Sequence, residues 1–163
     1  MSSNNLTFRH VSEIDLAKIR SFYQSYRGVP ESTWNEHCPN EEILQLDYSS
    51  GNLYGLYDNN QLIGAISVSD SNHLNDLPCW KYTENAKEIA RVVISKMHQG
   101  KGYGTIMLNM LWGILKQQGV DAIHLLVSLS NPRAINLYKK FHFENRGKYF
   151  LYDHDYYAME VRI

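Results

Sequence analysis

One glycine-rich stretch, Gln99-Gly100-Lys101-Gly102-Tyr103-Gly104, constrains the fold of this chain more than any other feature. It follows a β-branched run that ends at Ile94 and precedes an amphipathic pattern, so a strand must end and a helix begin within a few residues. The first N–H groups of a helix have no partner inside it, and the helix dipole adds positive charge there. Glycines at alternate positions leave no Cβ atoms over those N–H groups. The stretch therefore predicts a phosphate-binding turn.

Two common phosphate-binding glycine loops do not fit this stretch. A dinucleotide fingerprint needs a third glycine where this chain has Thr105. A Walker loop ends in Gly-Lys-Ser/Thr, whereas Gly104 is followed by Thr105 and Ile106. An ATP- or GTP-binding module would also need a Mg²⁺-binding carboxylate with a Ser or Thr partner, which the sequence does not place. Such a module stays as a rival hypothesis.

The composition predicts one compact domain without strong electrostatic bias. The 163 residues carry a formal net charge of −1, and a balanced charge argues against general nucleic-acid binding. No apolar run approaches the ~18 residues of a membrane span, and the polar N-terminus lacks a signal-peptide pattern. Cys38 and Cys79 lack metal-ligand spacing, so we expect plain thiols and no metal. We therefore predict a single domain over residues 1–163 in the cytoplasm, with no nucleic-acid or membrane partner.

Hydrophobic periodicity predicts the element order β-α-α-β-β-β-α-β-α-β-β. The expected strands are residues 6–10, 53–57, 62–69, 86–95, 120–128, 143–151 and 156–163. The expected helices are residues 12–26, a short one after Asn40, one from the glycine turn to Gly119, and one opened by Asn131-Pro132. Turns are expected at residues 58–61 and at Asp153-His154-Asp155. The order predicts an α/β domain with a mixed sheet.

With these residues in place, the chain resembles the GNAT superfamily of acyl-CoA-dependent N-acyltransferases. The glycine stretch matches that superfamily's pyrophosphate signature, Arg/Gln-x-x-Gly-x-Gly/Ala, at every fixed position. The other matching segments are residues 89–94, 131–134, 138–141, and 143–144 with Gly147. The resemblance implies an α/β (α+β) fold: a mixed, mostly antiparallel sheet of about seven strands flanked by four helices, with splayed parallel central strands.

The resemblance further implies that acetyl-CoA is the cosubstrate. The residues expected to bind it are Val92, Val93 and Ile94 on the strand, Gln99, Gly100, Lys101, Gly102, Tyr103, Gly104 and Thr105 at the turn, and Asn131. The turn amides would hold the pyrophosphate, and pantetheine would pair with the strand's main chain as a short extra strand. Asn131 is either only a helix N-cap or a cofactor contact as well.

Acetyl transfer from a thioester to an amine needs a base for the amine proton and an acid for the leaving thiolate. Glu88 resembles the glutamate base of the histone-acetylating branch of the superfamily, and its alternative role is a solvent-facing residue near the strand start. Tyr138 resembles the family's general acid, and its alternative role is a core tyrosine whose hydroxyl is satisfied elsewhere.

The resemblance, together with these residues, implies an N-acetyltransferase that acts on a primary amine by direct attack in a ternary complex. A small molecule is the favoured acceptor. The alternatives are a protein or peptide amine, and a non-catalytic CoA-binding regulator. The segments 28–40 and 70–85 are expected to determine the acceptor, and a homodimer is left open.

Overall fold

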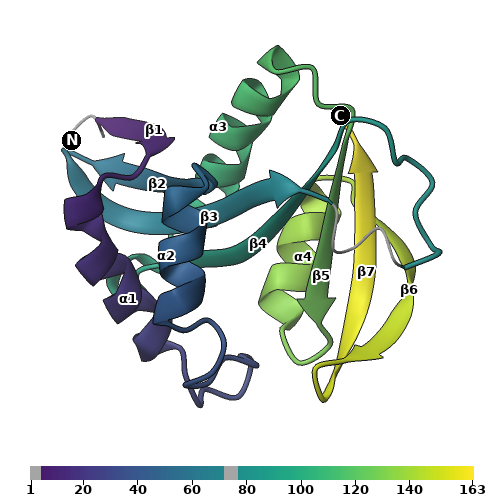
Figure 1. The fold of residues 1–163 in the computed structure, drawn as a ribbon, viewed down its shortest axis with the longest axis horizontal. Helices are drawn as coiled ribbons and strands as arrows, with labels where there is room; N and C mark the ends of the chain where they lie inside the picture. The colour runs from purple at the N-terminus through teal and green to yellow at the C-terminus, as the bar shows by residue number, and fades with distance from the viewer. Residues whose placement is uncertain (1–4, 72–76) are drawn as a thin grey trace. The chain divides into compact units, whose positions relative to one another are not determined.

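The computed structural model describes residues 5–71 and 77–163, which form a seven-stranded mixed sheet and four α-helices (Figure 1). The strands are β1 (Leu6–His10), β2 (Leu53–Asp58), β3 (Gln61–Asp70), β4 (Ala86–Ile94), β5 (Ala122–Ser128), β6 (Glu144–Leu151) and β7 (His154–Arg162). The helices are α1 (Leu16–Ser25), α2 (Glu41–Ser49), α3 (Tyr103–Gln117) and α4 (Pro132–Lys140). The predicted element order and fold class are confirmed.

The strand order in the sheet is β1-β2-β3-β4-β5-β7-β6. β1 with β2, β2 with β3, β5 with β7, and β7 with β6 pair antiparallel, whereas β4 and β5 pair parallel. The parallel ladder joins Ala86, Lys87 and Glu88 to Ala122, Ile123 and His124. The predicted parallel pair is therefore confirmed, and the splaying of its strands stays a prediction.

The chain divides into two compact units. The first unit comprises Met1–Arg27, Trp34–Val68 and Arg91–Leu111, and the second comprises Gly28–Thr33, Ser69–Ala90 and Trp112–Ile163. Both β4 and α3 begin in one unit and end in the other. The expectation of one domain over residues 1–163 stays a prediction.

In the first unit, α1 and α2 pack on β2 and β3. The apolar stripe predicted for α1 is buried there, and Asp15 accepts hydrogen bonds from the Ser12 N–H at 3.0 Å and the Tyr57 hydroxyl at 2.6 Å. Asp15, which directly precedes α1, thus ties the start of that helix to β2. The buried cluster consists of Val11, Leu16, Ile19, Phe22, Tyr23, Leu44, Leu53, Tyr57, Leu62, Ala65 and Val93.

Local sequence signals set most helix ends. The Asn40 side chain accepts the Ile43 N–H at 3.0 Å, so it caps α2. Gly119 has φ +76, the left-handed conformation expected just after α3.

Within residues 5–71 and 77–163, no helix has both the length and the apolar composition needed to cross a membrane.

In the second unit, β5 is flanked by β4 and β7, and its side chains are mostly buried on both faces, as its apolar run predicts. α4 packs through Tyr138, whose ring lies edge-on to Phe143 with centroids 5.5 Å apart. Trp112 lies in the part of α3 that belongs to this unit, and its ring centroid is 5.2 Å from that of Phe141.

The two hairpin turns had different outcomes. Asn59 and Asn60 join β2 to β3 with φ +50 and +66, as predicted for a two-residue turn. The predicted turn at residues 153–155 was wrong, because Tyr152 and Asp153 form it, with φ +51 and +64, and His154 already pairs with Leu151. A tyrosine gives no signal for the left-handed conformation, which is why the sequence misplaced this turn.

Candidate functional site

The glycine stretch forms the predicted turn between β4 and α3. Gly100 and Gly102 have φ +74 and +84, in the left-handed region that residues with a side chain rarely adopt. A Cβ atom built on either glycine would meet no heavy atom within 4 Å. The space above the turn is therefore open, as a bound pyrophosphate would require.

The start of α3 supplies the expected hydrogen-bond donors. The Ile106 N–H donates to the Gly102 carbonyl at 3.2 Å, so the helical hydrogen-bond pattern begins at Gly102. The amides of Tyr103, Gly104 and Thr105 lie in the first turn, where the helix offers them no carbonyl. Lys101, exposed beside them, adds positive charge. This arrangement can stabilise a phosphate group.

The strand segment before the turn is closely packed within the first unit. A Cβ atom on Gly64 of β3 would lie 2.7 Å from Ile94 Cδ1 and 3.0 Å from the Val93 carbonyl oxygen. The Tyr26 hydroxyl donates to the Ile94 carbonyl at 2.6 Å. The sequence predicted Tyr26 only as the last residue of a helix, because no local pattern reveals a hydrogen bond across 68 residues.

Arg91, also in β4, was not predicted to have a role. Its Nε and Nη2 atoms lie 2.7 and 2.9 Å from the two carboxylate oxygens of Asp47, and Nη2 lies 3.3 Å from Ser67 Oγ. Its φ is +51, although it lies inside a strand. Asp47 is only 5% exposed, so the ion pair is partly shielded from water.

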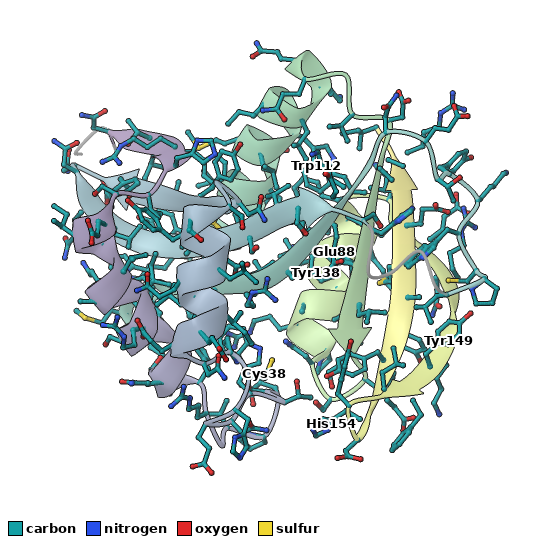
Figure 2. The ribbon with its side chains drawn as sticks, in the orientation of Figure 1. Cys38, Glu88, Trp112, Tyr138, Tyr149 and His154 are labelled. Atoms are coloured by element: carbon teal, nitrogen blue, oxygen red, sulfur yellow. The ribbon has the colours of Figure 1, made fainter. Side chains whose placement is uncertain are left out.

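The proposed catalytic residues Glu88 and Tyr138 lie in the second unit, on β4 and α4 (Figure 2). Tyr138 is buried, and burial raises the pKa of its hydroxyl, so the hydroxyl keeps its proton at neutral pH. Glu88 is partly buried, and its backbone lies opposite that of His124 in the parallel register of β4 and β5. Asn131 caps α4, because its side-chain oxygen accepts the Ala134 N–H at 3.1 Å. Its structural role is thus observed, and its cofactor role stays a prediction.

A buried polar cluster in the second unit was missed by sequence analysis. His124 Nδ1 lies 2.7 Å from Ser71 Oγ, and its Nε2 lies 2.8 Å from both Glu160 Oε2 and the Tyr82 carbonyl oxygen. The Trp80 ring stacks on the imidazole with centroids 4.0 Å apart. This cluster anchors the described part of segment 70–85 to β5 and β7, whereas residues 72–76 of that segment lie outside the described residues.

Glu160 is the acceptor at the centre of this cluster. It accepts the N–H groups of Lys81 and Tyr82 at 3.0 and 2.8 Å and Arg146 Nε at 2.7 Å. Burial alone would raise the pKa of Glu160, but hydrogen bonds from Tyr82, Arg146, Lys81 and His124 outweigh that effect and lower it. Glu160 is therefore a buried carboxylate held in its charged form.

The first unit also contains a cavity of about 280 Å³ between α1, α2 and the segment that joins them. Its lining includes Arg20, Arg27, Glu36 and Glu41. Arg20 pairs with Glu41 through two hydrogen bonds, one of them 2.7 Å long, and the hydrogen bonds from Arg20 and Gln45 lower the pKa of Glu41 to about 2. Arg20 therefore balances the negative charge of Glu41 at the start of α2.

Solved structures of acetyltransferases share this fold. An N-acetyltransferase from Staphylococcus aureus matches with a TM-score of 0.72 at 20% identity, covering 97% of this chain and 98% of that one. A putative acetyltransferase from Salmonella typhimurium, solved with its cofactor acetyl-CoA, matches with a TM-score of 0.74 at 19% identity, covering 97% and 94%. A ribosomal-protein-alanine N-acetyltransferase from Brucella melitensis matches with a TM-score of 0.69 at 17% identity, covering 96% and 99%.

The sequence itself matches a family model, described as the acetyltransferase (GNAT) family, over residues 19–143. That range contains the glycine turn, Glu88, Asn131 and Tyr138. The resemblance drawn from the sequence is thereby confirmed. The chain belongs to the GNAT acetyltransferase family.

Proposed function

We propose that this protein transfers an acetyl group from acetyl-CoA to a primary amine, with a small molecule as the acceptor. The observation that carries the proposal is the open, left-handed turn at Gly100 and Gly102 ahead of the first amides of α3. A pyrophosphate fits there because no Cβ atom covers the donors. Family membership supports the same reading.

In this proposal the chain binds acetyl-CoA along β4 and the turn. Residues 99–105 hold the pyrophosphate through main-chain N–H groups, and Lys101 adds charge at the rim. Residues 92–94 offer main-chain groups to pantetheine, although the Ile94 carbonyl already accepts the Tyr26 hydroxyl. Asn131 adds a contact from α4. Bound acetyl-CoA supplies an acetyl thioester ready for attack by an amine.

Two residues of the second unit move the protons. Glu88 accepts a proton from the amine, whose nitrogen then bonds to the acetyl carbon. As the carbon–sulfur bond breaks, Tyr138 gives its proton to the sulfur. Glu88 then releases the amine proton to solvent and Tyr138 takes one up from solvent, so both residues return to their starting protonation states. The Tyr138 hydroxyl is protonated at neutral pH, so its proton is available for the sulfur, and the pKa that burial raises makes it a weaker acid than an exposed tyrosine. The products are an acetylated amine and free CoA.

A small-molecule acceptor is favoured by the cavity between α1 and α2. Its volume of about 280 Å³ lies just below the range of typical ligand pockets, which begins at about 300 Å³, so it suits only a small acceptor. A protein or peptide N-terminus is the second candidate, because a structural neighbour is a ribosomal-protein-alanine N-acetyltransferase. A cytoplasmic location and a homodimer stay predictions.

Release of CoA thiol from acetyl-CoA, measured across a panel of acceptors, tests the function. The panel contains polyamines, amino acid derivatives, aminoglycosides and peptides with free N-termini. We expect turnover with a small amine. Turnover with peptides alone would move the assignment to the second candidate. Acetyl-CoA binding without turnover would indicate a regulator, and tighter binding of ATP than of acetyl-CoA would revive a nucleotide-binding module.

The role of Glu88 is tested by Glu88→Gln, with Glu13→Gln as the control because Glu13 is exposed and lies outside the segments expected to determine the acceptor. Loss of the base should lower kcat by about 10²-fold and change the acidic limb of the pH–rate profile. The control should leave both unchanged. An unaltered profile in Glu88→Gln would remove Glu88 from the mechanism.

A further inference from the structure

Arg91 has an unusual backbone conformation for a residue inside a strand. Its φ of +51 lies in the left-handed region, which costs energy for any residue with a Cβ atom. Within the described ranges, the other non-glycine residues with positive φ lie in turns or just outside an element. Arg91 directly precedes residues 92–94, which we assign to pantetheine.

The side chain of Arg91 is held by one residue on α2 and one on β3. Its Nε and Nη2 atoms meet the carboxylate of Asp47 on α2 at 2.7 and 2.9 Å, and Nη2 meets Ser67 Oγ on β3 at 3.3 Å. Asp47 is 5% exposed and Ser67 is 1% exposed. A two-point, charge-assisted contact of this kind restricts the guanidinium far more than a single hydrogen bond. All three residues belong to the first unit.

This contact explains how the left-handed conformation persists. A strained backbone position is kept only where the surrounding structure determines it, and such positions concentrate at functional sites. A left-handed residue within a strand rotates the peptide groups that follow it, as in a β-bulge. The directions of the Val92 and Val93 main-chain groups therefore depend on the conformation of Arg91.

We propose that Asp47 is a positioning residue: through Arg91 it holds the left-handed kink in β4 that aims the main chain of Val92 and Val93 at acetyl-CoA. The inference rests on the proposed function, since the direction of these groups affects turnover only if acetyl-CoA binds there. Asp47 itself touches no reacting atom in this proposal.

Two double variants isolate the backbone effect: Asp47→Asn/Arg91→Gly and Asp47→Asn/Arg91→Ala. Both remove the two charges together, so neither leaves a lone charge buried. Glycine adopts φ +51 freely, whereas alanine favours an ordinary strand conformation. We expect kcat/KM for acetyl-CoA, per folded molecule, to be about tenfold or more higher in the glycine variant, because misplacement of reacting groups is costly.

Equal kcat/KM in the two folded variants would overturn the positioning role. If wild-type protein shows no acetyl transfer, the proposed function fails, but the kink is still tested by the amide NMR shifts of Val92 and Val93. These shifts should stay near wild-type positions in the glycine variant and move in the alanine variant. Shifts that agree between the two variants would refute the kink without reference to activity.

A third variant covers the case in which the double variants do not fold. Arg91→Lys keeps the charge but loses the two-point geometry. We expect kcat/KM for acetyl-CoA to fall about tenfold while KM for the amine stays unchanged. Unchanged kcat/KM for acetyl-CoA would overturn the proposal.

Discussion

His124 Nε2 lies 2.8 Å from Glu160 Oε2, and neither side chain has any exposed surface. Because Glu160 is buried and accepts several donors, replacing its carboxylate weakens the whole cluster. Glu160→Gln should lower the free energy of unfolding by about 3 kcal/mol, the scale of a broken buried ion pair. Glu144→Gln is the control, since Glu144 bonds the same Arg146 but its side chain is 68% exposed. If urea unfolding shows that Glu160→Gln and Glu144→Gln lose equal free energy of unfolding, the central role of Glu160 is contradicted.

Glu160 also predicts how stability depends on pH. Its folded pKa is lowered below the ordinary value of 4.5, so its stabilising contribution is present above 4.5 and is lost as pH falls through the folded pKa. Wild-type protein should therefore lose stability in acid more steeply than Glu160→Gln, which has no proton to take up there. Urea unfolding at several acidic pH values gives the two slopes. Parallel slopes would mean that the Glu160 pKa is not lowered by folding.

Tyr138→Phe tests the general acid. The substitution keeps the buried ring against Phe143 and removes only the hydroxyl. We expect kcat to fall by about 10²-fold with acetyl-CoA affinity unchanged, as for the loss of a general acid. Steady-state kinetics and calorimetric titration give the two numbers, and Tyr152→Phe, at a residue 80% exposed, is the control. Full turnover in Tyr138→Phe would leave Tyr138 only a core residue.

Gly102→Val and Gly51→Val separate backbone strain from loss of the ligand site. Both glycines have positive φ, +84 and +72, and neither has a neighbour within 4 Å of an added Cβ atom. Both variants should lose similar stability, about 1–2 kcal/mol. Only Gly102→Val should lose acetyl-CoA affinity, by about tenfold or more, or about 1.4 kcal/mol. Intact binding in calorimetry would show that the turn does not hold the pyrophosphate.

Asn131 allows its two suggested roles to be separated. Asn131→Ala should destabilise the protein by about 1 kcal/mol, because the Ala134 N–H loses its cap. Asn131→Ser keeps a capping oxygen and should restore most of that stability. If Asn131 also contacts acetyl-CoA, both variants will bind acetyl-CoA more weakly. Wild-type affinity of Asn131→Ser for acetyl-CoA would show that Asn131 acts only as the N-cap of α4.

The sequence predicted what local periodicity and capping determine. The element order, the helix starts after Asn40 and at Asn131, and the glycine turn are each encoded by residues close together in the sequence. Contacts between residues far apart in the sequence leave no local pattern from which they could be predicted. Arg91 and Asp47 are 44 residues apart, and a strand pattern shows which face a residue occupies but not which helix covers it.

His124 shows the same limit in another form. It interrupts an apolar run, and nothing local indicates that Glu160 and Ser71 lie beside it. Buried polar residues must find partners, so an isolated histidine in such a run predicts a partner without identifying it. The pairing of β5 with β7 identifies Glu160, which lies directly opposite His124, whereas Ser71 comes from the chain just after β3.

The hydrogen bond from the Tyr26 hydroxyl to the Ile94 carbonyl, 2.6 Å long, has a consequence for protein engineering. Tyr26 lies at the end of α1, next to the segment that we expect to select the acceptor, and Ile94 ends the strand that leads to the glycine turn. Grafting an α1–α2 region from a relative would remove or reposition this donor. Acceptor preference and acetyl-CoA affinity should therefore change together in such chimaeras, unless the graft retains a tyrosine at position 26.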